Sequence, residues 1–112
     1  MEENEDIESK SVQIATQVII HAGNARSLVY EAFKDMEEYD FQPAEAKIVQ
    51  AQEEISPAHH VQTEVIQAEA RGDKVQVTLL LTHAQDTLMI AMSELQMARH
   101  MLEILKKLKE PK

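Results

Sequence analysis

The sequence predicts an all-α protein, an antiparallel three-helix bundle with short connections between the helices. Apolar residues recur at alternating three- and four-residue steps along three long segments, which is the spacing of a buried helix face. The composition also favours helices, with only two Gly, three Pro and no Trp among the 112 residues. A chain of this length is expected to form one domain around a single core.

Charge and composition exclude several classes of protein. The formal net charge of −9 argues against nucleic-acid binding, because phosphate contacts require clustered Lys and Arg. The chain has no Cys, which excludes a disulfide framework and a thiol nucleophile. The acidic start MEENEDIES lacks the basic and apolar regions of a signal peptide, and no apolar run approaches the ~20 residues of a membrane span. We therefore expect a cytoplasmic protein.

The first helix is predicted to run from about Ser11 to about Asp40. Residues 1–10 are too polar to pack and are predicted to be a disordered acidic tail, which leaves 11–112 as the single domain. The positions predicted to face the core are Ala15, Val18, Ala22, Ala25, Val29, Ala32, Met36 and Tyr39.

Gly23 lies inside this helix, at a cost of about 1 kcal/mol relative to Ala. It is interpreted either as a tolerated glycine or as a point of close approach, and the small residues Ala22 and Ala25 beside it favour close packing. Arg26 lies next to this face of small side chains and is either a surface charge or a group that orients another side chain.

The second helix is predicted from Pro43, which suits the first turn of a helix, to about Ala70. Its core positions are predicted to be Ala44, Ile48, Ala51, Ile55, Ala58, Gln62, Val65 and Glu69. Pro57 removes a backbone hydrogen bond within this segment, yet the apolar pattern stays in phase across it. We therefore expect one bent helix. The polar Gln62 must find partners in the core.

The third helix follows a turn at 71–74, and Val75–Val77 is expected to be an extended lead-in. Thr78 and Thr82 are both candidates for its N-cap, and the spacing Thr82-x-x-Gln85 matches a capping box.

Two neighbouring apolar seams run along the third helix. The first comprises Leu81, Ala84, Leu88, Ala91, Leu95, Ala98, Leu102 and Leu105. The second comprises Leu79, His83, Asp86, Ile90, Ser93, Met97, His100 and Ile104. A helix that is apolar around so much of its circumference is normally buried on several sides. We expect the first seam to pack within the subunit and the second to face copies of itself.

The second seam contains the candidate functional residues. A helical spacing of three residues allows Asp86 to interact with His83, which lies near the solvent-accessible start of the helix. A neutral imidazole is a competent nucleophile toward phosphorus. By contrast, His59 and His60 are interpreted as surface or interface histidines.

Three motifs resemble those of one family, the enzyme IIA components of lactose- and cellobiose-type sugar phosphotransferase systems. Residues 82–89, Thr-His-Ala-Gln-Asp-Thr-Leu-Met, resemble its His-(Ala/Gly)-Gln-Asp-His-Leu-Met signature. Residues 22–27, Ala-Gly-Asn-Ala-Arg-Ser, resemble its Ala-Gly-x-Ala-Arg-Ser. Residues 58–63, Ala-His-His-Val-Gln-Thr, resemble its Ala-His-x-x-Gln-Thr. The similarity covers roughly residues 12–108, and Ala84 favours the cellobiose-type branch.

This resemblance implies a homotrimer, a nine-helix coiled-coil bundle that works as a phosphoryl carrier. His83 would accept the phosphoryl group through Nε2 from the histidine-containing phosphocarrier protein and pass it to a cysteine of the cognate enzyme IIB. Asp86 would meet its two symmetry mates around a magnesium ion (Mg²⁺) on the trimer axis. All-oxygen ligands suit such a hard ion, and the ion would offset the repulsion between three buried carboxylates.

Two further positions near His83 bear on the site. Gln85 either contacts the phosphoryl group or caps the helix. Thr87 stands where the family usually has a second histidine, and a threonine does not carry a proton near neutral pH. Pro57 is a milder departure from the family pattern.

Two other functions fit parts of the sequence. A non-catalytic helical bundle with an interaction or regulatory role would explain the seams but not His83 and Asp86 among them. A metal-dependent bundle hydrolase would need a second cluster of ligands, and none of the five histidines has Glu three residues before it.

Overall fold

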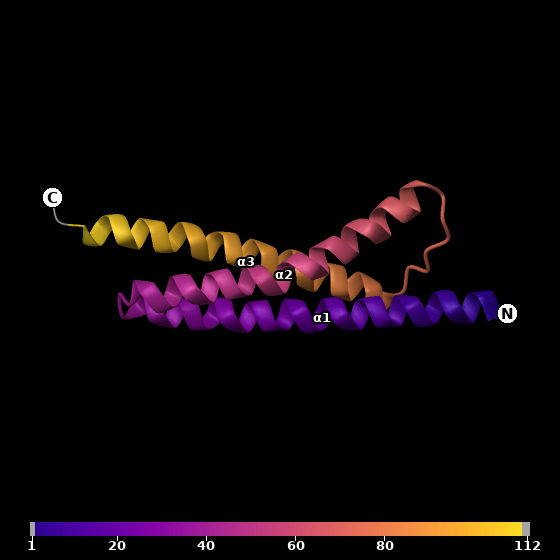
Figure 1. Ribbon diagram of the computed structural model, residues 1–112, viewed down its shortest axis with the longest axis horizontal. Coiled ribbons are helices and arrows are strands. Elements are labelled where there is room, and N and C mark those ends of the chain that lie inside the picture. The colour runs from indigo at the N-terminus through magenta and orange to yellow at the C-terminus, as the bar shows by residue number, and fades with distance from the viewer. Residues whose placement is uncertain (1, 111–112) are drawn as a thin grey trace.

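Three long helices make up the structure, a computed structural model that describes residues 2–110. Helix α1 spans Glu2–Glu37, α2 spans Phe41–Ala70 and α3 spans Leu79–Lys109, and the described residues contain no strand. Figure 1 shows that α2 runs antiparallel to α1 and that α3 returns in the direction of α1. The bundle is 67 Å long. This confirms the predicted all-α, three-helix fold of the chain.

Helix α1 begins earlier than predicted. Residues 2–10 are helical, so the prediction that the helix starts near Ser11 is wrong. The reason is local: Glu and Asp in the first turn of a helix interact favourably with its dipole, and Glu is a good helix former. The division of the chain into a tail at 1–10 and a domain at 11–112 stays a prediction. Residue 1 of the predicted tail and residues 111–112 of the predicted domain lie outside the described residues.

The turn between α1 and α2 closes through backbone hydrogen bonds. The Tyr39 amide donates to the carbonyl of Met36 (3.0 Å), and the Asp40 amide donates to that of Asp35 (2.9 Å). This pairing is a Schellman motif, which requires the left-handed conformation that Tyr39 adopts at φ 56°. Helix α2 then starts at Phe41, and Pro43 lies in its first turn, where its missing N–H costs nothing.

Helix α2 is continuous through Pro57, as predicted. Figure 1 shows its C-terminal half diverging from α1. A proline inside a helix both removes a hydrogen bond and pushes the preceding turn aside, which accounts for a bend in the middle of α2. The divergence leaves a hollow of about 430 Å³ between α1, the end of α2 and the segment that follows it.

The start of α3 is set by Thr78. Its hydroxyl accepts a hydrogen bond from the Leu81 amide (3.0 Å), which makes it the N-cap. Thr82 lies inside the helix, and its hydroxyl donates to the carbonyl of Thr78 (3.1 Å). The capping box predicted at Thr82 and Gln85 is therefore wrong. The lead-in Val75–Val77 has no regular secondary structure, and the Thr78 that follows it is extended.

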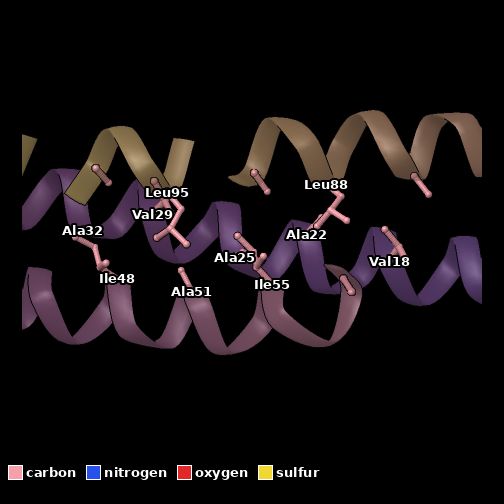
Figure 2. Close-up of a cluster of buried hydrophobic side chains, with 14 of the residues drawn as sticks. Val18, Ala22, Ala25, Val29, Ala32, Ile48, Ala51, Ile55, Leu88 and Leu95 are labelled. Atoms are coloured by element: carbon pink, nitrogen blue, oxygen red, sulfur yellow. The ribbon is translucent and has the colours of Figure 1, made fainter. Parts of the chain in front are cut away.

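The core is formed by one apolar face from each helix, and Figure 2 shows these side chains meeting between the three ribbons. Nearly all predicted core positions are buried, with Ala alternating with larger residues; Leu88 and Leu95 are the largest fully buried side chains. Burying one such leucine contributes about 1.5–3 kcal/mol. Two predicted core positions are wrong: Tyr39 and Glu69 are exposed, because they lie at the ends of their helices.

The second seam of α3 faces solvent in the single chain. Its apolar members Ile90, Met97 and Ile104 are 47%, 59% and 57% exposed. Contact with other copies of the chain would cover this face, and that part of the prediction stays a prediction. The described helices include none that combines the length and apolar character needed to cross a bilayer.

Candidate functional site

The candidate nucleophile His83 lies in the second turn of α3, where the cap at Thr78 starts the helix. Its side chain is exposed, and the structure records no hydrogen bond or ion pair for the imidazole among the described residues. The hydroxyl of Thr87, one turn later, donates to the backbone carbonyl of His83 (2.8 Å). Thr87 is thus engaged with the helix backbone, while the imidazole is accessible to an incoming group.

Asp86 lies on the same exposed face as His83. No ion pair joins the two side chains among the described residues, so the interaction expected from their spacing is not formed within one chain. Along the second seam, Asp86 is followed by Ile90, an apolar side chain that is 47% exposed. A carboxylate placed in such a seam is accessible to other copies of the chain.

Gln85 lies toward the interior of the bundle. Residues two apart on an α-helix are separated by about 200° around its axis. Gln85 is accordingly half-buried and, together with Gln62 of α2 and Leu81, lines a small pocket beneath the start of α3. The structure therefore does not bring Gln85 together with His83 in one chain, and Thr78 already caps the helix. Gln62 is buried, and no buried side-chain nitrogen or oxygen among the described residues is without a partner.

The motif at residues 22–27 contributes both core and surface. Ala22 and Ala25 are fully buried, whereas Gly23 is exposed, and a Cβ added to it would meet no atom within 4 Å. The close approach predicted at Gly23 is therefore absent within one chain. Arg26 is a surface charge: its Nε donates to Glu94 Oε1 of α3 (2.7 Å), beside a surface hollow of about 460 Å³.

A polar cluster that sequence analysis missed joins α1 to α2. His21 Nδ1 lies 2.9 Å from Glu54 Oε2, and the Asn24 amide donates to the same oxygen (3.3 Å). The hydrogen bond from His21, followed by that from Asn24, lowers the pKa of the Glu54 carboxyl. The helical spacing of His21 and Asn24 was the available signal, but nothing in the sequence connects them to a residue about thirty positions away.

The geometry of one chain does not complete a metal site. Among the described residues, no three His, Cys, Asp or Glu side chains gather closely enough to hold an ion. Asp86 supplies a single carboxylate with no partner recorded in the described part of the chain. A site built from Asp86 would therefore need the same residue from other copies of the chain.

Comparisons with known proteins agree with one another. A family profile described as "PTS system, Lactose/Cellobiose specific IIA subunit" matches residues 13–106. The chain is 46% identical to the lichenan-specific phosphotransferase enzyme IIA component of Bacillus subtilis, over 96% of this chain and 94% of that protein.

Two solved structures are similar in fold and sequence. The cellobiose-specific enzyme IIA from Bacillus anthracis has a TM-score of 0.80 and 43% identity, covering 87% of this chain and 89% of that one. The IIA subunit in the solution structure of the IIA(Chitobiose)-HPr complex from Escherichia coli has a TM-score of 0.73 and 37% identity, covering 88% of this chain and 95% of that one.

Proposed function

Because this chain belongs to the family of lactose/cellobiose-specific IIA subunits of the sugar phosphotransferase system (PTS), we propose that it carries a phosphoryl group on His83 during sugar uptake. The observation that carries the proposal is the exposed, unpartnered His83 imidazole within the part of the chain that matches the family. The proposed cellular location is the cytoplasm, and the proposed sugar is a lactose/cellobiose-type disaccharide.

The proposed chemistry is a relay of two phosphoryl transfers. The phosphorus–nitrogen bond of the phosphorylated HPr, the histidine-containing phosphocarrier protein, breaks as a bond to Nε2 of His83 forms. That bond then breaks as the phosphoryl group passes to a cysteine thiolate of enzyme IIB. Such transfers depend mainly on positioning and charge stabilisation, so an accessible imidazole on a rigid helix suffices on this chain's side.

The proposed partner HPr is supported by the similar chain solved in complex with it. The net charge of −9 provides an acidic surface that would attract a basic partner. Enzyme IIB is proposed as the acceptor from the family resemblance, and the lack of cysteine in this chain fits a protein that passes the group to another protein's thiolate. Gln85 faces the interior of its own chain, so the proposed transfer assigns it no contact with the phosphoryl group.

The proposed assembly is a homotrimer in which the second seam of α3 lines the three-fold axis. That arrangement would cover Ile90, Met97 and Ile104, which are about half exposed in one chain. Three copies of Asp86 would then converge, and their oxygens with added waters fit Mg²⁺. The ion would neutralise the carboxylates and hold the subunits together; it has no part in the transfer steps proposed for His83.

The experiment that tests the carrier function is phosphorylation in a purified system. The chain is incubated with HPr, the kinase of HPr and phosphoenolpyruvate, and the product is analysed by mass spectrometry. We expect one acid-labile phosphohistidine per chain, located at His83. The His83→Gln variant should accept no phosphoryl group yet keep its helix content, because the side chain is exposed.

Matched variants separate a specific site from general histidine chemistry. Replacing His21, His59, His60 or His100 by Gln should leave acceptance intact. Phosphorylation of the His83→Gln variant on another histidine would refute the assignment to His83. Failure of the wild-type chain to accept any phosphoryl group would favour the non-catalytic bundle.

A further inference from the structure

Polar residues recur at one heptad position of the exposed face of α3. Asp86, Ser93 and His100 follow one another at intervals of seven residues. The residues between them on this face, Ile90 and Met97, are apolar. All three polar side chains are exposed in the single chain. The function proposed above gives a role to Asp86 but none to His100, which repeats its position two heptads later.

The imidazole of His100 has no partner in the structure. Two other histidines are engaged with carboxylates: His21 with Glu54 of α2, and His60 with Glu64 one turn along the same helix. For His100, the structure records no hydrogen bond or ion pair among the described residues. Its ring nitrogens are therefore available to a ligand.

Three-fold symmetry would bring three such imidazoles together. In a parallel three-stranded coiled coil, residues at one seam position form a layer of three side chains around the axis. This step rests on the proposed homotrimer. Asp86 and His100 occupy equivalent heptad positions. A three-fold axis that runs between the three Asp86 carboxylates therefore also runs between the three His100 imidazoles. Ile104 and Met97 lie in the seam on either side of His100 and would shield that layer from water.

We infer that His100 from three subunits forms a second axial metal site, specific for a borderline divalent ion such as zinc. Three imidazole nitrogens with one water are a common tetrahedral ligand set for zinc. Imidazole also suits Ni²⁺ and Cu²⁺, whereas Mg²⁺ prefers carboxylate and water oxygens. The two axial sites would thus select different ions.

The second site is separate from the one proposed at Asp86. A rise of 1.5 Å per residue puts the Asp86 and His100 layers about 21 Å apart along the helix. Neither layer can share ligands with the other at that distance. A change at His100 should therefore leave the Asp86 layer and the phosphorylation site intact.

The test is a titration of metal-free trimer with Zn²⁺ in buffer containing excess Mg²⁺, followed by isothermal calorimetry. We expect one Zn²⁺ per three chains. Co²⁺, used as a spectroscopic probe, should give the visible absorption bands of a tetrahedral complex. The His100→Gln variant should lose both signals, and light scattering and circular dichroism would verify that it is still a folded trimer.

Matched variants identify the histidine responsible. His59 is also exposed with no partner recorded in the described residues, but it lies on α2. The His59→Gln variant should bind Zn²⁺ as the wild type does. Zinc binding that persists in His100→Gln, or that reaches one ion per chain, would refute the site, as would a verified trimer that binds no Zn²⁺.

The failure of this site is distinguishable from failure of the proposed function. A chain that accepts phosphoryl groups and is trimeric, but binds no Zn²⁺, contradicts only the His100 site. A monomer in light scattering would remove the shared axis and with it this site. The phosphorylation experiment tests His83 independently of both results.

Discussion

Tyr39 is the residue whose backbone conformation most limits its replacement. It is the one non-glycine residue in the described range with positive φ, at 56°. Its ring is half exposed, packs edge-on against Phe41 and lies under the Lys109 ammonium group, 4.5 Å from ring centroid to Nζ. The left-handed conformation costs a residue with a Cβ about 1–2 kcal/mol.

We expect Tyr39→Gly to be more stable than Tyr39→Ala by about 1 kcal/mol, because both lose the ring but only Gly relieves the strain. Urea unfolding followed by circular dichroism measures the difference. At the neighbouring Glu38, where φ is not positive, the order should reverse and Ala should be more stable than Gly. Equal stabilities of the two Tyr39 variants would show that the turn opens in solution.

Thr87 illustrates how a residue departs from its family without disturbing the fold. Where the family usually has a second histidine, the Thr87 hydroxyl bonds the carbonyl of His83. Because the Thr87 hydroxyl donates its proton to this carbonyl, it does not donate it to an incoming phosphoryl group. In the transfer proposed for His83, a proton exchanged near the imidazole would therefore be supplied by the partner protein or by water.

At the scale of the helices, polar contacts set how α1 meets α2. Lys47 Nζ of α2 lies 2.6 Å from Asp35 Oδ2 of α1, and this hydrogen bond raises the pKa of the lysine. Toward the middle of both helices, Glu54 is bonded by His21 and Asn24. These pairs join the two helices beside the apolar core.

The stabilisation by Glu54 should depend on pH. Its pKa is lowered below the ordinary 4.5, so the folded state favours the charged form, and this stability is present above pH 4.5 and lost as pH falls through the folded pKa. We expect Glu54→Gln to be less stable than the wild type at neutral pH, by under about 1 kcal/mol for so accessible a group. The difference should disappear at an acidic pH below the folded pKa, where the Glu54 carboxyl is protonated in both states.

Urea unfolding at both pH values measures this effect. Glu53→Gln is the matched control, since Glu53 is exposed and has no hydrogen bond recorded among the described residues. A Glu54→Gln variant that differs from the wild type equally at both pH values would show that the carboxylate charge is not the source of the stability.

At the scale of the whole molecule, the second seam of α3 is apolar yet exposed, and the packing of a single chain does not explain it. If it lines a three-fold axis, three Asp86 carboxylates meet away from water, which costs several kcal/mol unless a cation or protons intervene. We expect protein reconstituted with Mg²⁺ alone to melt at a lower temperature after chelation. Thermal unfolding by circular dichroism measures this shift.

The Asp86→Leu variant provides the control. It should remain trimeric in light scattering, be indifferent to chelator and be at least as stable as the wild type, because it removes the repulsion and matches Ile90 and Met97. A wild-type melting temperature unaffected by chelator would point to shared protons in place of the ion. A monomer at micromolar concentration would contradict the axial arrangement.

The sequence by itself determined the number of helices, the face that each one buries, and the placement of His83 and Asp86 on a second face of the third helix. These follow from local periodicity: residues three and four apart share a helix face whatever surrounds the helix. Even the continuity of α2 through Pro57 could be predicted, because the seam stays in phase on both sides. The three motifs likewise identified the family from short segments of sequence.

Only the tertiary structure decided which groups meet across helices. The pairing of Arg26 with Glu94 and of His21 with Glu54 depends on how the helices are aligned, which local spacing does not encode. The same holds for Gln85, whose half-buried place beside α2 results from the packing of the bundle. Two helix starts were decided by local interactions instead: α1 begins earlier than predicted, at Glu2, and of the two predicted N-cap candidates for α3 it is Thr78 that caps the helix.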